Sequence, residues 1–339
     1  MNRKKFTLTA TASPVPGSNP ESHAPEDSLF RLQRRRNVAA LMGLAGLISF
    51  GFTAPVAAER ISITPDQAGK CSGNKCRLAL VLGGGCHRAL AHVGVIKVLE
   101  TNGITPDLIV GTSAGSMVGA LYASGLRADA LEKAAAELTW DAIQKFDLSR
   151  FGFYTADPLR AYIDRAVKGK KIEEFPVRYA SVATDLQTGT PRVFSRGEAG
   201  LAVQASASTP GVFQPTIVDG RQLVDGGVIS PVPVMTAKNL GADTVIAVNV
   251  SFPPTEARLN DIVDVVMQAF TISTHQLVLR ELAAANVAIS PVIPQVDDMG
   301  FKNHPLFIAA GERAASAALP AIHKALSRTK TRARQGERL

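Results

Sequence analysis

A serine stands between two glycines where a predicted strand gives way to a predicted helix. The pentapeptide Gly111-Thr112-Ser113-Ala114-Gly115 follows an apolar run at residues 108–110. A Gly-x-Ser-x-Gly turn in this context is typical of a nucleophile elbow, which exposes the serine at a tight turn. The helix that follows would offer free N–H groups and its positive dipole end to developing negative charge. Ser113 is therefore a candidate nucleophile, and the simpler alternative is a glycine-rich turn with an incidental serine.

Three consecutive glycines, residues 83–85, follow an earlier predicted strand and lead through Cys86, His87 and Arg88 into a helix. Backbone N–H groups in such a loop suit an oxyanion or a phosphate. The spacing does not match the Gly-x-Gly-x-x-Gly dinucleotide fingerprint, and no Gly-Lys-Ser/Thr completes a Walker A loop. A strand-loop-helix unit shortly before an elbow serine is the arrangement that an oxyanion hole requires.

A carboxylate followed by two glycines stands at the end of another predicted strand, in Asp225-Gly226-Gly227. The two glycines would let this loop approach another loop closely. Taken alone, the motif is equally typical of an aspartate that caps a turn.

These three loops, in this order, resemble the bacterial, NTE-type members of the patatin-like phospholipase family over about residues 78–325. Two further stretches, residues 183–189 and 205–213, agree with the family. The resemblance implies a three-layer α/β/α fold with a mainly parallel central sheet, and a Ser-Asp dyad with no histidine. By position, Ser113 is then the nucleophile and Asp225 the general base. The oxyanion hole falls on Gly84, Gly85, Cys86, His87 and Arg88, and the motif glycines are Gly111, Gly115, Gly226 and Gly227.

The chain departs from the family pattern at three positions. Many members have Gly-Gly-Gly-x-Arg-Gly at the first loop, whereas here Cys86 replaces the third glycine and Ala89 the last. Ser230 stands where bacterial members often have Asn. Cys86 can still donate its N–H provided that the loop needs no positive φ there. We interpret Cys86 as an oxyanion-loop residue and not as a nucleophile.

Short apolar runs alternate with helical stretches from Arg77 onward, which favours a mainly parallel sheet covered on both faces. The predicted strands are residues 78–82, 108–110, 179–184, 222–224 and 244–250. The predicted helices are residues 91–100, 116–124, 128–138, 158–167, 261–286 and about 305–326. The expected organisation is a signal region 1–58 (n-region 1–36, apolar segment 37–58), a linker 59–76, a catalytic domain 77–251 with its motif core at about 78–238, a helical part 252–327 and a basic tail 328–339.

The N-terminal pattern predicts export to the periplasm. Three arginines, residues 34–36, precede an uncharged run that ends in small residues near Ala58. This order is typical of a secretory signal, and the consecutive arginines also permit the twin-arginine route. The alternative is an inner-membrane anchor, because the 22 residues 37–58 just reach a spanning length. After export, Cys71 and Cys76 would be able to form a small disulfide.

The net charge of +8 lies at the ends of the chain. Residues 1–60 carry +4 and residues 313–339 carry +6, so the body nets −2. A nucleic-acid enzyme needs a basic face on its folded body, so nucleic acid is excluded as a partner. The amphipathic C-terminal stretch and basic tail instead predict peripheral contact with an anionic membrane. No cysteine or histidine spacing predicts a metal site, and we expect no cofactor.

The resulting prediction is a serine lipid acyl hydrolase that cleaves phospholipid or lysophospholipid carboxyl esters through an acyl-enzyme. One alternative is a Ser-Asp-His α/β-hydrolase esterase that uses His275, His304 or His323. A second is an exported lipid-binding protein without turnover, and a third is an acyltransferase. His87 and His92 are candidates for orienting substrate, and Arg88 for either attracting an anion or bracing the loop.

Overall fold

The computed structural model describes residues 78–256, 259–294, 296 and 301–336. The predicted signal region, the linker and the Cys71–Cys76 pair lie outside these residues, so export and the disulfide stay predictions. No helix in the described ranges is both long and apolar enough to cross a membrane.

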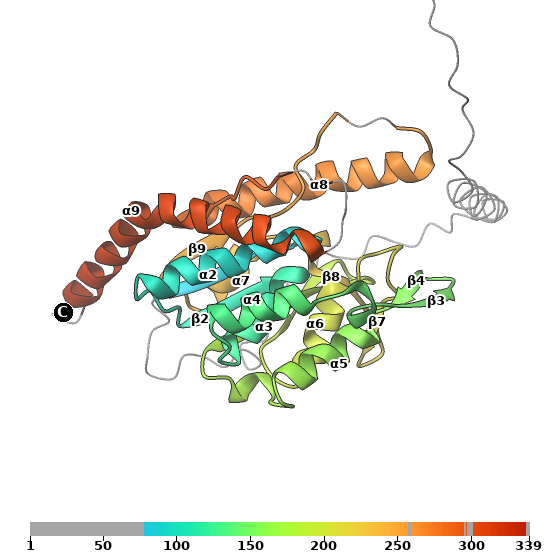
Figure 1. The fold of residues 1–339 in the computed structure, drawn as a ribbon, viewed down its shortest axis with the longest axis horizontal. Coiled ribbons are helices and arrows are strands. Elements are labelled where there is room, and N and C mark those ends of the chain that lie inside the picture. Colours follow the sequence, from blue (N-terminus) through green and yellow to red (C-terminus); the bar gives the residue numbers. More distant parts are fainter. Residues whose placement is uncertain (1–77, 257–258, 295, 297–300, 337–339) are drawn as a thin grey trace, which may run out of the picture. The chain divides into compact units, whose positions relative to one another are not determined.

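A mixed, mostly parallel sheet forms the centre of the fold (Figure 1). In the described part of the chain its strand order is β10-β9-β1-β2-β5-β8-β7, with β6 also paired to β5. The strands from β10 to β5 are parallel, whereas β6, β7 and β8 pair antiparallel. Their bounds are β1 Leu78–Leu82, β2 Leu108–Thr112, β5 Arg178–Asp185, β6 Thr190–Phe194, β7 Thr216–Val218, β8 Arg221–Asp225, β9 Thr244–Val248 and β10 Val287–Ile289.

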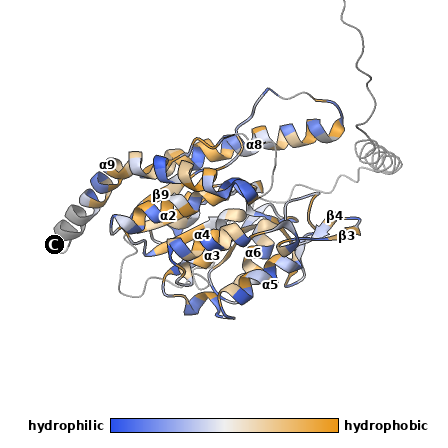
Figure 2. Ribbon diagram, in the orientation of Figure 1, coloured by the Kyte–Doolittle hydropathy of each residue, from blue (hydrophilic) through white to orange (hydrophobic). Residues whose placement is uncertain are grey.

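Helices pack on both faces of this sheet, which confirms the three-layer prediction. Along β1, Leu80 and Leu82 join a core with α2, α3, α4, α5 and α9, while Ala79 and Val81 join a second core with α7 and α8. Apolar and polar residues alternate along α8 and α9 (Figure 2). The bounds are α2 Ala91–Thr101, α3 Ala114–Ala123, α4 Ala128–Glu137, α5 Asp157–Ala166, α6 Ala199–Ala207, α7 Val234–Asn239, α8 Ile262–Ala284 and α9 His304–Gly336.

The C-terminal part differs from the prediction in two respects. The part predicted to be helical, residues 252–327, also contains β10, which extends the parallel sheet beside β9. A three-residue strand is too short to leave a periodic pattern in the sequence. The predicted start of the tail at residue 328 lies inside α9, which continues to Gly336.

The sequence prediction also missed a separate two-stranded antiparallel sheet, formed by β3 Lys145–Ser149 and β4 Gly152–Thr155. Strands β6 and β7 and helices α6 and α7 were likewise not predicted. The β3–β4 turn contains no Asn-Gly or Asp-Gly pair, which is the strongest short-range signal for a hairpin.

The register of β5 brings the ends of two other strands together. Thr112, the last residue of β2, lies opposite Val182, and Asp225, the last residue of β8, lies opposite Ala183. Because β2 is parallel and β8 antiparallel to β5, these two strands run toward each other. Ser113 follows Thr112 directly, so this register places Ser113 beside Asp225.

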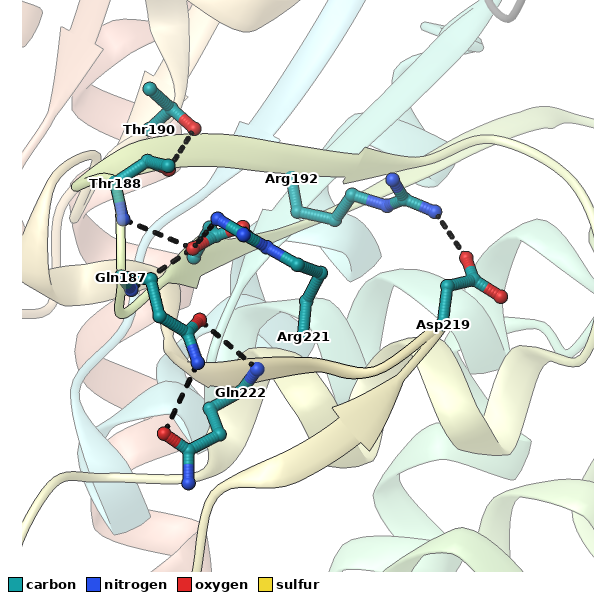
Figure 3. Close-up of polar contacts among 8 residues, drawn as sticks. Gln187, Thr188, Thr190, Arg192, Asp219, Arg221 and Gln222 are labelled. Atoms are coloured by element: carbon teal, nitrogen blue, oxygen red, sulfur yellow. Dashed lines mark hydrogen bonds and ion pairs between the residues drawn. The ribbon is translucent and has the colours of Figure 1, made fainter.

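A polar network fixes the other end of β8 against the β5–β6 turn. Arg221 donates two hydrogen bonds to the carboxylate of Asp185, at 2.7 and 2.9 Å. Gln187 donates from Nε2 to Oε1 of Gln222, and its own Oε1 accepts from the backbone N–H of Gln222, as Figure 3 shows. Asp185 also accepts from the N–H groups at the start of the turn. These contacts hold the strand that carries Asp225.

Candidate functional site

Ser113 occupies a strained position between β2 and α3. Its φ of 55° and ψ of −130° lie in a region that residues other than glycine rarely adopt. The Ser113 N–H donates to Oγ of Ser206 at 2.8 Å, and Ser206 in turn donates to the carbonyl of Val182 at 2.6 Å. Both Ser206 and Val182 are fully buried. The elbow backbone is thus held by a buried side chain from α6.

The glycines on either side of the elbow are required by close backbone contacts. A Cβ at Gly111 would lie 2.5 Å from Cα of Ser116, and one at Gly115 would overlap the carbonyl of Leu82. The carboxylate loop has the same need, because a Cβ at Gly226 would overlap the carbonyl of Val182. The motif glycines therefore allow the elbow and carboxylate loops to pack tightly against neighbouring strands.

The hydroxyl of Ser113 donates to Oδ2 of Asp225 at 2.7 Å, with no histidine between them. Asp225 is only 6% exposed. Its Oδ1 accepts from the N–H of Gly227 at 2.7 Å, and its Oδ2 also accepts from Oγ1 of Thr209 at 3.1 Å. The structure therefore brings together the two residues that the sequence predicts as a dyad.

Burial raises the pKa of the Asp225 carboxyl above its ordinary value, while the hydrogen bonds from Ser113, Gly227 and Thr209 oppose the rise. Desolvation disfavours the charged carboxylate, whereas donors stabilise it. A raised pKa makes the carboxylate a stronger base toward a hydroxyl. Asp225 is thus suited to take a proton from the serine that it contacts.

The glycine loop packs directly against Ser113. A Cβ at Gly84 would lie 3.1 Å from Cβ of Ser113. Gly84 donates its N–H to the carbonyl of Pro231 at 2.9 Å, and Arg88 donates its N–H to Gly85 at 3.1 Å. Neither of these two N–H groups is available for an oxyanion, which narrows the predicted donor set. Among the residues described, no acceptor is found for the N–H groups of Gly85 and Cys86.

Cys86 does adopt a positive φ, of 53°, so the condition stated for it from the sequence is not met. The residue nevertheless takes up this conformation, and its N–H group has no acceptor among the described residues. This left-handed conformation costs a non-glycine residue about 1–2 kcal/mol. The residue is exposed, yet desolvation of the thiol and the nearby Asp225 carboxylate raise the pKa of the Cys86 thiol. A raised pKa disfavours the reactive thiolate.

Arg88 braces the loop. Its Nε donates to the carbonyl of Val250 at 2.8 Å, and its guanidinium lies 4.9 Å from the ring centroid of Phe252. His87 is buried and packs its ring against Phe252 and Phe307. Of the two interpretations for Arg88, these contacts favour the structural one.

His92 lies beneath the glycine loop and is fully buried. Its Nε2 is 2.8 Å from the carbonyl oxygen of Gly83. Burial lowers the pKa of His92 to about 4, so the ring is neutral at pH 7 and Nε2–H is the donor to this oxygen. His92 is wholly buried and contacts the glycine loop through Gly83, so any help it gives in orienting substrate would act through this loop.

Residues 80–238 match the family model described as patatin-like phospholipase. The chain contains a patatin-like phospholipase domain. The match covers the predicted motif core at about residues 78–238 and stops short of residue 325.

Several relatives match about half of the chain. NTE family protein Rv1063c of Mycobacterium tuberculosis is 38% identical over 178 residues, which cover 52% of this chain and 49% of that protein. Human patatin-like phospholipase domain-containing protein 6 is 37% identical over 181 residues, covering 51% and 13%. Lysophospholipase NTE1 of Scheffersomyces stipitis is 34% identical over 180 residues, covering 51% and 12%. The chain thus spans about half the length of the mycobacterial relative and about an eighth of the two eukaryotic ones.

Ser230, one of the departures from the patatin-like pattern, joins the elbow to α8. Its carbonyl accepts from Oγ1 of Thr112 at 2.8 Å, and its hydroxyl donates to the buried carboxyl of Glu281 at 2.8 Å. Ala89 is buried in a short 3-10 helix, Cys86–Leu90, that connects the glycine loop to α2. Both substitutions are therefore accommodated in packed positions of the patatin-like domain.

A polar cavity of about 240 Å³ lies away from the dyad of the patatin-like domain. It is lined by residues of α5, α6 and β7, including Asp157, Arg160 and Gln204, and by neither dyad residue. Within the described ranges no group of three or more His, Cys, Asp or Glu residues is placed to hold a metal ion.

Two polar residues of the site had no predicted role. Thr209 and Ser206 both lie in the stretch 205–213, whose resemblance to the family was noted without assigning either side chain. A single hydroxyl leaves no spacing signal, and each acts on a partner far away in the sequence. The family stretch itself was the signal that pointed to them.

Proposed function

We propose that this protein is a serine lipid acyl hydrolase that cleaves carboxyl esters of phospholipids or lysophospholipids. The observation that carries the proposal is the 2.7 Å hydrogen bond from Ser113 to the buried Asp225. Beside this pair lies a glycine loop with two N–H groups that have no acceptor in the described part of the chain. The family description and the relative named a lysophospholipase support a lipid ester as substrate.

In the proposed reaction, Oγ of Ser113 attacks the ester carbonyl as its proton passes to Oδ2 of Asp225. The N–H groups of Gly85 and Cys86 hold the oxyanion of the tetrahedral intermediate. When this collapses, the alcohol leaves with the proton from Asp225, and an acyl-serine remains. Asp225 then deprotonates a water that attacks the acyl-serine, and Ser113 recovers its proton as the fatty acid departs.

The test is fatty-acid release from phospholipid vesicles and lysophospholipid micelles, with chelator present. Ser113→Ala and Asp225→Asn should each lower turnover by roughly three orders of magnitude. Asp219→Asn makes the same chemical change at an exposed carboxylate paired with Arg192, and it should leave turnover unchanged. Release by Asp225→Asn at the parent rate would contradict the role of Asp225.

The same assay separates the alternative functions. If folded parent protein binds lipid vesicles but releases no acid, the lipid-binding alternative is favoured. If release begins only when an alcohol or lysolipid acceptor is added, and the acyl group is found on that acceptor, the protein is an acyltransferase. The direct Ser113–Asp225 bond gives the Ser-Asp-His alternative no support.

A further inference from the structure

The β3–β4 hairpin exposes four large apolar side chains. These are Phe146 at 65%, Leu148 at 65%, Phe151 at 48% and Phe153 at 38% exposure. The hairpin forms a sheet of its own and projects from the body of the fold (Figure 1). An isolated two-stranded hairpin is marginally stable in water, and a group of exposed apolar residues marks an interaction surface.

The base of the hairpin is fixed to the loop that follows α6. Phe153 donates its N–H to the carbonyl of Val212 at 2.9 Å, and Gln214 donates its N–H to the carbonyl of Tyr154 at 2.9 Å. The rings of Tyr154 and Phe213 lie 6.2 Å apart. The hairpin is therefore held in a defined position at its base.

That loop leads directly to the dyad. Phe213 donates its N–H to the carbonyl of Thr209 at 2.9 Å, and the Thr209 hydroxyl donates to Asp225 at 3.1 Å. Only one short loop thus separates the base of the apolar hairpin from the proposed general base. The base of the hairpin and the dyad are therefore attached to the same loop, residues 208–215.

The charges of the hairpin suit an anionic lipid surface. Lys145 and Arg150 accompany the apolar residues, and Asp147 is the single acidic residue of the segment 145–155. The Arg150 guanidinium lies 4.7 Å from the ring centroid of Phe151. Aromatic rings beside cationic side chains are the composition of segments that lie at a membrane interface.

Helix α8 also exposes apolar residues, but in a different electrostatic setting. Val265 and Val266 are 50% and 59% exposed and follow the N-cap residue Asp261 and Asp264 of the first turn. Acidic side chains are repelled by anionic lipids. Val265 and Val266 are thus exposed apolar residues, as those of the hairpin are, but they lie beside acidic and not basic side chains.

We propose that the β3–β4 hairpin docks the protein onto a phospholipid bilayer. Phe146, Leu148, Phe151 and Phe153 enter the boundary between headgroups and acyl chains, and Lys145 and Arg150 contact lipid phosphates. The proposal rests on the proposed function, because docking here delivers the ester of a membrane lipid to the dyad. It is separate from the contact predicted for the basic tail.

The first experiment measures binding to phosphatidylglycerol/phosphatidylethanolamine vesicles by co-sedimentation, in a Ser113→Ala background so that lipid is not consumed. Leu148→Ser combined with Phe151→Ser should lower vesicle partitioning at least tenfold. Val265→Ser combined with Val266→Ser is the matched control and should bind as the parent does. Unchanged partitioning of the hairpin variant, or loss only in the α8 variant, would overturn the proposal.

A second variant does not depend on loss of binding. Phe151→Trp places a fluorescent reporter at the tip of the hairpin, and because the parent chain has one tryptophan, the difference from the parent spectrum gives the signal of the new residue. Its emission should shift to the blue when vesicles are added, and Arg150→Glu should weaken this response on anionic vesicles more than on neutral ones. No shift while the protein co-sediments with vesicles would show that another surface docks.

Hydrolysis of a water-soluble short-chain acyl ester separates docking from catalysis. With Ser113 present, the Leu148/Phe151 variant should keep the parent rate on this substrate and lose it on vesicles. If the parent cleaves no ester but the variant still loses vesicle binding, the proposed function fails and the docking surface stands. If the parent is a dimer that the variant converts to a monomer, with vesicle binding intact, the hairpin is a protein interface and the proposal is overturned.

Discussion

The hydroxyl of Thr209 donates a hydrogen bond to Oδ2 of Asp225 at 3.1 Å. The same oxygen accepts from Ser113, so two hydroxyls share the atom that would receive the proton. Burial raises the pKa of this carboxyl, and the bonds from Ser113, Gly227 and Thr209 oppose that rise. Thr209 therefore adjusts how basic Asp225 is through a direct hydrogen bond to its carboxylate.

Replacing Thr209 with Val should shift the pH dependence of turnover. Loss of the donor raises the pKa of Asp225 further, because the carboxylate is less stabilised. Since only the deprotonated form accepts the serine proton, the acid limb of kcat/KM should move to higher pH. The measurement is a pH profile on a soluble ester, with Thr209→Ser as the control that keeps the hydroxyl. An acid limb at the same pH in all three proteins would show that Thr209 does not act on Asp225.

Replacing Cys86 with Gly should stabilise the protein by about 1 kcal/mol. Cys86 has a φ of 53°, and glycine removes the cost of this conformation, offset in part by a more flexible unfolded chain. Cys86→Ala keeps the Cβ and should leave the free energy of unfolding nearly unchanged. Urea unfolding of the three proteins measures the difference. Equal stability of the Gly and Ala variants would mean that the backbone is not strained at this position.

The parts of the site that follow from local pattern were predictable from the sequence. Ser113 and Asp225 lie in short glycine-containing motifs, and each motif stands at the end of a strand. Their contact depends on the pairing of Thr112 and Asp225 with consecutive residues of β5, and this register has no local signature. Ser206 acts across the fold in the same way. The β3–β4 hairpin was not predicted because its turn lacks the Asn-Gly or Asp-Gly pair that marks most short hairpins.

Replacing Ser206 with Ala should destabilise the protein by about 1–3 kcal/mol and lower kcat. The change removes the acceptor of the Ser113 N–H and leaves this donor without a partner at a constrained turn. Ser116→Ala is a matched control, because Ser116 donates to a Ser113 carbonyl that already accepts two backbone N–H groups. Its effect should be smaller on both unfolding and turnover. A larger loss in the Ser116 variant would contradict the importance assigned to Ser206.

The Asp185–Arg221 pair should stabilise the protein at neutral pH but not in acid. The pKa of Asp185 is lowered, first by the hydrogen bonds from Arg221 and further by the N–H groups of Thr188 and Gln187. A carboxyl whose pKa is lower in the folded state stabilises the protein at pH values above its ordinary pKa, which is 3.8 for Asp. That contribution is lost as the pH falls through the lower, folded-state pKa. Asp185→Asn should therefore lower Tm at pH 7 and make little difference once the parent carboxyl is protonated.

Tm measured against pH for the parent and Asp185→Asn checks this expectation. Asp225 and Glu281 have raised pKa values, so they stabilise the folded protein at low pH and not at neutral pH. Both carboxyls are present in the parent and in Asp185→Asn, so their effect on Tm cancels when the two proteins are compared. Asp219→Asn, in the neighbouring β7–β8 turn, is the control for losing one paired carboxylate, since the Asp219–Arg192 pair is largely exposed and surface pairs contribute little. A parallel pair of curves for parent and Asp185→Asn across the whole range would mean that the charge of Asp185 does not stabilise the strand that carries Asp225.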